Sequence, residues 1–577
     1  MLVKYNQGSR ARTLGLLLFI AVGIIIVRLF QIQIIEHDKY VKQADQEYIK
    51  RLVIPAKRGT IYAMDQTQPV QLVMNETIYT LFADPSVVTN PKKAEDVIKK
   101  VAGGNLVTDV KTALSKTNTR YQVLATKLSR TQAELIKKYQ LAGIGFQETT
   151  QRVYPEGSLG SQVLGFVNDD GEGQYGVEGA LNKQLRGTDG LLESVTDISS
   201  VPLTIGSKNI NQPAKDGDNV VLTIDRNVQA YVEKALAAGL QKSHAQNGSV
   251  IVMDPNSGKI MAMANIPTYD QSQYSKATDA QVFQNAVTSD PYEPGSVVKT
   301  FIMSTGIDTG AVTPASTYYN TDEIKVGDAT IKNALTGVLG NISMQTVLNY
   351  SLNTGAVTVA ERIDGGNLNR AGRDTIYDYY HNHFGFGQMT GVQLYEVPGE
   401  IISPKQTEGN AVRYSNMAFG QGFDATMLQV ARAFSAVVNG GKLYQPSVVN
   451  GVIDNNGVFK EDKPKIAQKG VIKSSTSASM RQMLTTARNF MFSAEDKKGY
   501  QIGGKTGTSQ VLINGSYSMT TTTASYLGFG GDSGPKYVIM VRMSSPGMNL
   551  QGNIDAEPVF SNISNWLIDY LMLKPGE

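Results

Sequence analysis

The chain has 577 residues, which is too many for one compact core, so its length predicts two or more domains. Hydrophobic residues make up 41% and charged residues 18%, which excludes a disordered chain and one embedded in membrane throughout. The net charge of +3 identifies no class of partner, and no run of basic residues interleaved with aromatics suggests nucleic-acid binding. Because there is no cysteine, structural disulfides are excluded and a zinc site is disfavoured, which suits an exported protein.

An apolar segment near the N-terminus predicts a membrane anchor. Residues 14–27 are almost unbroken apolar sequence, and this character resumes after Arg28 as far as Ile35. As a helix, residues 14–35 would be about 33 Å long at roughly 1.5 Å per residue, enough to cross a bilayer core of about 30 Å. The tail before them carries basic and no acidic residues, so the positive-inside bias predicts a cytoplasmic N-terminus. No small-x-small cleavage site follows, which favours an anchor over a cleaved signal peptide.

The sequence after the anchor changes character near residue 216. Residues 36–215 mix strand-like runs with a polar helical segment around 92–116 and group no titratable residues in a catalytic pattern, which favours a structural or docking role. Residues 206–217 are polar and turn-rich, and are interpreted as an interdomain linker.

The remaining sequence predicts an α+β domain. Strands are expected near both of its ends, with mostly helical sequence between, so one sheet should unite the two ends. The expected elements are a strand at 220–224, a helix at 226–240, a hairpin at 249–264, strands at 525–530 and 537–543, and an amphipathic helix at 558–573.

Ser296 and Lys299 form the first of three short motifs. Pro294-Gly is typical of a helix start, and the apolar residues that follow cluster on one side of a helix at 100° per residue. Ser296 and Lys299 then project together from the other side, one turn apart. This places an amine beside a hydroxyl, as a serine nucleophile without histidine requires, and burial or a second cation would lower the lysine pKa. Taken alone, S-x-x-K is more typical of a surface helix.

Two further motifs follow in the chain. Ser351-Leu-Asn353 lies between two helical stretches, where serine and asparagine alone indicate a turn or an N-cap. Lys505-Thr-Gly-Thr508 follows two glycines and precedes strand-like sequence, and alone it is typical of a glycine-rich strand or turn.

Together, S-x-x-K, S-x-N and K-T-G-T in this order resemble the penicillin-binding proteins and serine β-lactamases. Flanking sequence narrows the resemblance to the class B (monofunctional) penicillin-binding proteins. The similar blocks are YEPGSVVK around Ser296, preceded by Asn285-Ala286, FGQG at 419–422, GGKTGTSQ around Lys505, the hairpin at 250–265, KRGTIY at 57–62 and GVEG at 176–179. One departure is Ala63-Met-Asp-Gln-Thr67, which stands where D-R-N-G is expected and touches the N-terminal domain, not the chemistry.

The resemblance implies the architecture and the location. The fold would be α+β, with a penicillin-binding or serine β-lactamase-like transpeptidase domain (an antiparallel sheet flanked by helices), an N-terminal pedestal domain and one transmembrane helix. The expected boundaries are a cytoplasmic tail at 1–13, the anchor at 14–35, the pedestal or dimerisation-like domain at 36–215 and the transpeptidase domain at 216–577. The protein would be a single-pass cell-membrane protein with an extracytoplasmic catalytic domain.

The resemblance also implies a mechanism. Ser296 would attack the penultimate D-Ala carbonyl of a D-Ala-D-Ala stem peptide, and Lys299 would accept its proton. Backbone N–H groups of Ser296 and Thr508 would form an oxyanion hole. By resemblance, the catalytic residues are Ser296, Lys299, Ser351, Asn353 and Lys505, and the substrate-binding residues are Thr506, Gly507 and Thr508.

The implied partners follow from that chemistry. They are peptidoglycan stem peptides as D-Ala-D-Ala donor and amine acceptor, β-lactams that acylate the same serine, and a separate membrane glycosyltransferase of the SEDS type. No segment resembles a glycosyltransferase domain, and the chemistry needs no metal and no organic cofactor. A role in division and a role in elongation both fit, and the acceptor amine, the β-lactam affinity and the oligomeric state stay open.

Three other functions fit parts of the sequence. Residues 499–506 satisfy G-x-x-x-x-G-K-[ST], the phosphate-binding loop of an ATPase, although that loop needs a helix to begin at Lys505-Thr506. A β-lactamase or β-lactam sensor would share the fold, and a non-catalytic scaffold of wall synthesis would share the partners.

His381 and His383 suggest a metal pair, but aromatic packing is the favoured interpretation of these two residues. Trp566, on the last predicted helix, is expected to be a core anchor.

Overall fold

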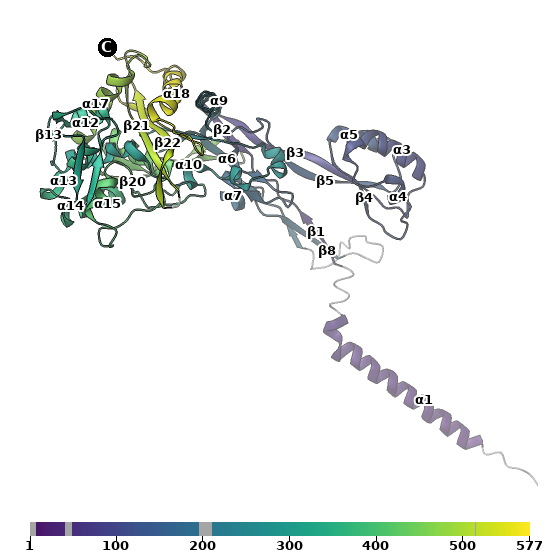
Figure 1. The fold of residues 1–577 in the computed structure, drawn as a ribbon. Coiled ribbons are helices and arrows are strands. Elements are labelled where there is room, and N and C mark those ends of the chain that lie inside the picture. The colour runs from purple at the N-terminus through teal and green to yellow at the C-terminus, as the bar shows by residue number, and fades with distance from the viewer. Residues whose placement is uncertain (1–6, 41–48, 196–209, 514, 577) are drawn as a thin grey trace, which may run out of the picture. The chain divides into compact units, whose positions relative to one another are not determined.

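The computed structural model describes residues 7–40, 49–195, 210–513 and 515–576. The chain divides into two compact units, one made of Met1–Arg58 with Arg186–Gly217 and the other of Gly59–Leu185 with Asp218–Glu577. Figure 1 shows the elements of both units in chain order.

The first unit contains the predicted apolar helix. Helix α1 (Gln7–Phe30) continues into η1 (Gln31–Ile35), and the stretch from Arg12 to Ile35 is long and apolar enough to cross a membrane, with none of its most apolar window buried. Residues 1–6 of the predicted tail lie outside the described residues.

A three-stranded sheet completes the first unit and corrects the linker prediction. Its strands are β1 (Ile49–Ile54), β8 (Gly190–Val195) and β9 (Ile210–Gln212). Because β9 pairs antiparallel with β8, residues 210–212 of the predicted linker are strand, and residues 206–209 lie outside the described residues. Polar sequence therefore did not exclude backbone pairing here.

The second unit begins with a mixed seven-stranded sheet that joins sequence from both sides of residue 216. Strand β10 pairs in parallel with β2 and antiparallel with β18, so the strand predicted at 220–224 lies inside this sheet. Helices pack at the far end of β3 and β4 around a core of their own, which confirms helical sequence near 92–116. The elements are β2 (Ile61–Asp65), β3 (Gln68–Ala83), α3 (Pro91–Ala102), α4 (Val110–Leu114), β4 (Gln122–Leu128), α5 (Arg130–Lys137), β5 (Ile144–Val153), β10 (Asn219–Asp225), β18 (Val449–Ile453) and β19 (Phe459–Glu461).

A buried ion pair explains two of the sequence blocks near this sheet. Arg152 on β5 bonds Glu178 at 2.7 Å, and both side chains are buried. The same guanidinium donates to the backbone oxygen of Gly59 at 2.8 Å. The G-x-E and R-G-x-I blocks therefore meet at one arginine, and each offsets part of the cost of burying that charge, since Nη2 of Arg152 is buried with no hydrogen-bond partner among the described residues.

The second sheet of this unit carries the site. Five antiparallel strands in the order β12-β11-β23-β22-β21 unite residues 247–266 with residues 501–544, which confirms that one sheet joins the two ends of the domain. The strands are β11 (Asn247–Met253), β12 (Ile260–Ile266), β21 (Gln501–Ile513), β22 (Ser516–Gly531) and β23 (Pro535–Ser544).

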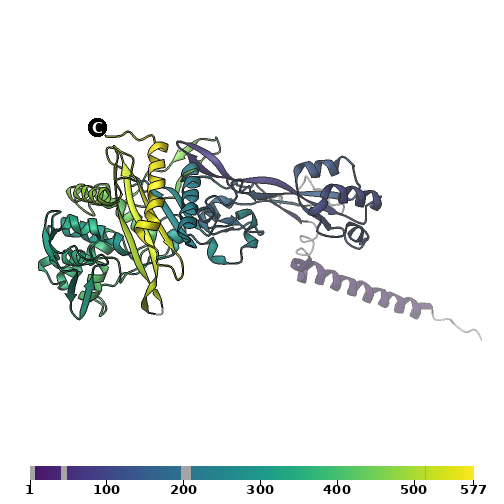
Figure 2. The ribbon, with the colours of Figure 1, turned by 45° about the horizontal axis from the view of Figure 1, so that its top comes forward.

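Helices cover both faces of this sheet (Figures 1 and 2). Helices α9 (Arg226–Ser243) and α18 (Glu557–Tyr570) pack on one face, where Val250 and Val252 of β11 point. Ile251 and Met253 alternate to the other face and belong to the core formed by α11 (Lys299–Asp308), α16 (Met427–Val438) and α17 (Ser474–Phe492). The period-2 alternation of a two-sided strand thus divides the domain into two cores.

The remaining elements of the unit are short. They are η2 (Gly103–Asn105), α6 (Ser161–Leu164), β6 (Phe166–Val167), β7 (Gly173–Gln174), α7 (Gly176–Ala180), α8 (Asn182–Arg186), η3 (Gln271–Lys276), η4 (Ala280–Phe283), α10 (Ala286–Ser289), η5 (Gly295–Val298), β13 (Thr317–Asn320), β14 (Glu323–Val326), β15 (Ala329–Lys332), β16 (Gly340–Ser343), α12 (Met344–Tyr350), α13 (Asn353–Arg362), η6 (Ile363–Gly365), α14 (Arg370–Tyr377), η7 (Asp378–His383), α15 (Ala411–Met417), β17 (Lys442–Tyr444), β20 (Ile466–Lys469) and η8 (Gly552–Ala556). Trp566 stacks on Tyr231 of α9 with ring centroids 4.3 Å apart, and it is half-buried, so it packs against the edge of the core and does not lie inside it as a core anchor would.

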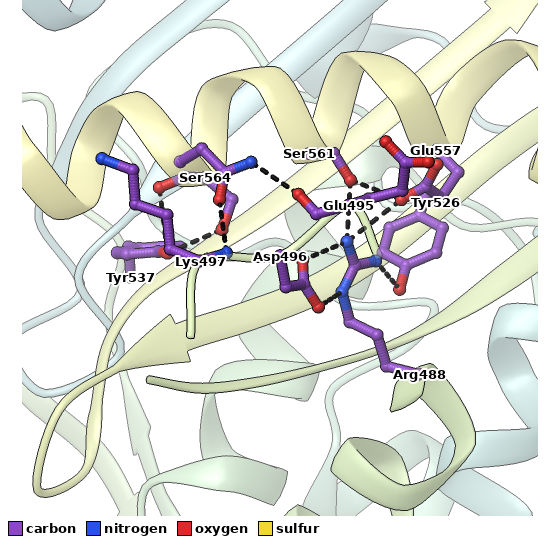
Figure 3. Close-up of polar contacts among 10 residues, drawn as sticks. Arg488, Glu495, Asp496, Lys497, Tyr526, Tyr537, Glu557, Ser561 and Ser564 are labelled. Atoms are coloured by element: carbon purple, nitrogen blue, oxygen red, sulfur yellow. Dashed lines mark hydrogen bonds and ion pairs between the residues drawn. The ribbon is translucent and has the colours of Figure 1, made fainter. Parts of the chain in front are cut away.

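A buried arginine ties α17 to the sheet and to α18. Figure 3 shows the guanidinium of Arg488 between Asp496, Tyr526 and Glu557, and its side chain is 0% exposed. It donates to both carboxylate oxygens of Asp496 at 2.7 and 2.6 Å, to Glu557 at 3.0 Å and to the hydroxyls of Ser561 at 2.7 Å and Tyr526 at 2.5 Å. Every donor group thus has a partner, so the desolvated charge is stabilised.

Replacing this arginine should destabilise the second unit strongly. Arg488→Ala leaves Asp496 and Glu557 without their cation, and the expected loss in free energy of unfolding is about 3–5 kcal/mol. The matched control is Arg370→Ala, which breaks a half-exposed pair with Asp374 on α14 and should cost less than about 1 kcal/mol. Urea unfolding curves of the three proteins measure this, and equal losses in both variants would contradict the assignment.

Candidate active site

Ser296 lies in the short helix η5, directly before α11. Gly295 has a φ of +64°, and a Cβ at that position would lie 3.0 Å from the backbone oxygen of Thr508. The left-handed φ favours glycine here, and the loop before the serine lies close against β21. The apolar residues that were expected to cluster after Ser296 are all buried. Since Lys299 and Thr300 are buried as well, the polar side of this helix faces the protein interior and not solvent.

Lys299 follows Ser296 by one helical turn, and its side chain contacts the serine from the protein interior. Its Nζ is 2.8 Å from Ser296 Oγ, 2.7 Å from the backbone oxygen of Ser351, 3.2 Å from Ser351 Oγ and 2.7 Å from Asn353 Oδ1. The residue is 1% exposed. Burial, and second the positive charge of Lys505, lower the pKa of Lys299 well below its usual range. The structure thus brings the first two motifs together around one amine.

The acceptors around this amine direct its hydrogens. A backbone carbonyl and the oxygen of an amide can only accept hydrogen bonds, so Ser351 O and Asn353 Oδ1 take two hydrogens of Nζ in either protonation state. In the charged form the third hydrogen points to Ser296 Oγ, and in the neutral form the lone pair is left for the hydroxyl of Ser296. The orientation of the Asn353 amide is independently determined, because its Nδ2 donates to the backbone oxygen of Lys332 at 2.9 Å.

Ser351 has an unusual backbone conformation that directs two of its oxygen atoms toward Lys299. It ends α12 with φ 56° and ψ 42°, in the left-handed region, which costs a non-glycine residue roughly 1–2 kcal/mol. In this conformation the carbonyl and the hydroxyl of the same residue both contact Lys299. Such local strain at a site where two groups converge indicates a functional constraint.

Lys505 lies on β21, behind the cleft. It is 3% exposed, and its Nζ donates to the backbone oxygen and the hydroxyl of Thr506, each at 3.2 Å. Burial lowers the pKa of Lys505 to about 7. The phosphate-loop alternative is wrong, because Lys505 and Thr506 lie inside a strand, paired with Leu527 and Tyr526 of β22, where that loop requires a helix to begin.

Gly507 and Thr508 complete the third motif. A Cβ at Gly507 would lie 2.3 Å from Ser525 Oγ on β22 and 3.0 Å from a side-chain carbon of Val297, so glycine avoids a clash with β22 and lets β21 lie close to the serine helix. The hydroxyl of Thr508 accepts a hydrogen bond from the backbone N–H of Gly552 at 3.1 Å, which leaves its own hydrogen for a ligand.

The three motifs open onto one cleft of about 840 Å³. Ser296, Ser351, Asn353, Thr506 and Thr508 line it, whereas Lys299, Lys505 and Gly507 are not among the lining residues and lie behind them. Sequence reasoning did not assign the other walls to the site. Of these, Gly295, Phe419, Gln421 and Gln510 belong to recognised blocks; the others include Leu335, Tyr350, Asn416, Phe490, Met491, Gln551 and Asn553.

The two candidate metal ligands of η7 are packed against aromatic rings, as expected. The His381 ring stacks on Tyr377 with centroids 5.0 Å apart, and its Nδ1 is 2.9 Å from the backbone oxygen of Phe386. The His383 ring lies 4.5 Å from that of Tyr379. Across the described ranges, no group of three or more His, Cys, Asp or Glu side chains is arranged to hold a metal ion.

Comparison with known protein families decides the family. Residues 248–565, more than half of the chain, match the model of the penicillin binding protein transpeptidase domain, and residues 53–222 match that of the penicillin-binding protein dimerisation domain. The chain belongs to the class B penicillin-binding proteins. It therefore has the transpeptidase fold of these peptidoglycan D,D-transpeptidases, an N-terminal dimerisation domain and one apolar N-terminal helix.

Relatives of this class B penicillin-binding protein are similar over most of the chain. Stage V sporulation protein D of Bacillus subtilis is 30% identical over 99% of this chain and 87% of its own length. Penicillin-binding protein PbpB of Mycobacterium tuberculosis is 32% identical over 74% of this chain and 63% of its own.

Solved structures share the fold. Penicillin binding protein 3 of Mycobacterium tuberculosis, complexed with ampicillin, has a TM-score of 0.67 at 25% identity, covering 91% of this chain and 97% of that chain. Penicillin binding protein 2X of Streptococcus thermophilus has a TM-score of 0.74 at 24% identity, covering 91% of this chain and 80% of that chain, which shows the likeness of fold alone.

The lowered pKa of Lys505 predicts a pH-dependent stability. The unfolded lysine keeps an ordinary pKa of about 10.4, so between about pH 7 and pH 10 the unfolded chain binds one proton more than the folded protein. The free energy of unfolding should therefore rise with pH across this window, by about 1.4 kcal/mol per pH unit for this proton. Lys505→Met should remove this part of the slope, as measured by urea unfolding at several pH values. Lys332→Met, at an exposed lysine, is the control, and parallel profiles for wild type and Lys505→Met would refute the prediction.

Proposed function

We propose that this protein is a peptidoglycan D,D-transpeptidase of the cell wall that works through an acyl-enzyme on Ser296. The observation that carries the proposal is the buried Lys299 amine, 2.8 Å from Ser296 Oγ at the edge of a cleft. A serine hydroxyl is a weak nucleophile until a neighbouring base takes its proton, and a lysine with a lowered pKa is such a base. No other described residue is needed to activate the serine in this scheme.

Acylation would begin with transfer of the Ser296 proton to Lys299. Ser296 Oγ forms a bond to the carbonyl carbon of the penultimate D-Ala, and the negative charge that develops on the carbonyl oxygen is stabilised by the backbone N–H groups of Ser296 and Thr508. Thr506 and Thr508 hold the terminal carboxylate, and the close approach allowed by Gly507 keeps their strand beside the serine. The D-Ala–D-Ala peptide bond then breaks.

Departure of the terminal D-Ala requires a proton on its nitrogen. Ser351 is the relay in this scheme, because its hydroxyl is 3.2 Å from Lys299 Nζ and lines the cleft. Lys505 in its charged form favours this transfer electrostatically. Asn353 positions the base through its bond to Lys299 and keeps one amide hydrogen for the acyl chain. An amine of a second stem peptide attacks the acyl-enzyme and gives the cross-link, and β-lactams acylate the same serine.

The location and partners of this enzyme belong to the same proposal. The apolar helix supports a single-pass cell-membrane protein, and the basic tail supports a cytoplasmic N-terminus with the catalytic domain outside. The layout is a tail at 1–13, an anchor at 14–35, a pedestal or dimerisation-like domain at 36–215 and a transpeptidase domain at 216–577. A membrane glycosyltransferase of the SEDS type would supply the glycan strands.

Labelling with a fluorescent penicillin tests the proposal. Full-length protein in detergent should form a covalent adduct that lasts many minutes and maps to Ser296 by peptide mass spectrometry, and Ser296→Ala should abolish it. The control is Ser304→Ala, because that serine of α11 bonds only the helix backbone at 2.6 Å from Thr300 O and should label like wild type.

The other outcomes identify the alternatives. Rapid loss of the label with release of hydrolysed penicillin would indicate a β-lactamase. An absence of label on folded protein would contradict the assignment of Ser296 as the nucleophile and favour a non-catalytic scaffold. A lasting adduct on another residue would show that the acyl-enzyme forms elsewhere.

A further inference from the structure

The loop that carries Ser296 is braced by a second loop, which begins with the F-G-Q-G block at residues 419–422. Tyr292 and Ala425 exchange two backbone hydrogen bonds of 3.1 and 3.0 Å. Gly295 donates its N–H to the backbone oxygen of Gly420 at 3.0 Å, and a Cβ at Gly420 would lie only 2.0 Å from the oxygen of Gly295. The block therefore gives the serine loop a backbone support that no larger residue could supply.

Glu293 connects this support to the third motif. Its Oε1 accepts a hydrogen bond from the backbone N–H of Gly422 at 2.6 Å and another from the hydroxyl of Tyr517 at 3.0 Å. Tyr517 lies on β22, next to β21, the strand that carries Lys505 to Thr508. One carboxylate oxygen thus joins the serine loop, the F-G-Q-G loop and the β21–β22 hairpin.

All the hydrogen bonds that the Glu293 side chain makes among the described residues use one acceptor oxygen. Both hydrogen bonds use Oε1, and Oε2 is buried with no hydrogen-bond partner among the residues that the structure describes. Burial raises the pKa of this carboxyl group, so the site does not favour the charged form. Glu293 is not among the residues that line the cleft, so no direct contact with a substrate is assigned to it.

We propose that Glu293 is a positioning residue that holds the serine loop at its working distance from strand β21, through the F-G-Q-G loop and Tyr517. This inference rests on the proposed role of Ser296. The two halves of the oxyanion hole, the N–H groups of Ser296 and Thr508, come from these two segments. A small shift between them lowers the rate of bond formation more than it weakens the initial binding of a ligand, because the misplacement is felt at the reacting atoms.

Stopped-flow acylation by a fluorescent penicillin, which separates the initial dissociation constant from the acylation rate constant, tests the proposal. Tyr517→Phe should lower the rate constant about threefold to tenfold with little change in the dissociation constant. Glu293→Ala should lower it more, whereas Glu293→Gln keeps the acceptor oxygen and should stay within about threefold of wild type. In the double variant, Tyr517→Phe should cost nothing beyond Glu293→Ala, because the partner of its hydroxyl is gone.

Three results would overturn the proposal: an unchanged rate constant in Tyr517→Phe, additive effects in the double variant, or equal losses for Glu293→Gln and Glu293→Ala. The matched control is Tyr231→Phe, which removes a hydroxyl bond to Asn562 on the opposite face of the sheet and should leave acylation unchanged. If Glu293→Ala fails to fold, Tyr517→Phe and Glu293→Gln still test the proposal. Tyr517 is an exposed side chain, so its replacement by Phe should not prevent folding. Wild-type protein that forms no adduct would instead reject the proposed function itself.

Discussion

The site depends on the burial of one amine, that of Lys299. A lysine in water is charged and cannot accept a proton, so the proposed chemistry requires a dry position that disfavours its charge. The protein supplies this position, because α11 is surrounded by the domain core, and Lys505 on β21 adds to the effect when it is charged. The acceptors that remain around Nζ are a carbonyl, an amide oxygen and two hydroxyls, none of which carries a charge. A carboxylate at any of these places would restore the charge of the amine.

The Lys299 amine must be buried and must still contact Ser296 at the cleft. This arrangement requires close contact between segments that are far apart in the chain. Gly295 and Gly507 let the serine helix and β21 lie close together without a crowded side chain between them, and Ser351 adopts a left-handed conformation to direct two oxygens inward. Each of these features costs stability locally. The two cores on either side of the five-stranded sheet and the fully partnered Arg488 offset that cost, so the strained groups stay in place without a ligand.

Local patterns in the sequence predicted a large part of this arrangement. The spacing of Ser296 and Lys299 is one helical turn, and the hairpin at 249–264 and the last helix follow from periodicity that short segments determine by themselves. The conformation of Ser351 and the walls at Phe490 and Gln551 could not be predicted, because packing of distant segments determines them. Glu293 illustrates the limit, since its partners lie 129 and 224 residues away. Strand β9 was missed because polar residues can pair through their backbones as well as apolar ones.

The protonation state of Lys299 tests this account most directly. Neutron diffraction from crystals of the deuterated protein at about pH 8 locates hydrogens on Nζ and on the serine hydroxyl. The account predicts two deuterons on Nζ, directed at Ser351 O and Asn353 Oδ1, and the deuteron of Ser296 directed at the lone pair of the amine. Three deuterons on Nζ, with the Ser296 hydroxyl turned away, would contradict it, because Lys299 would then be unable to activate the serine.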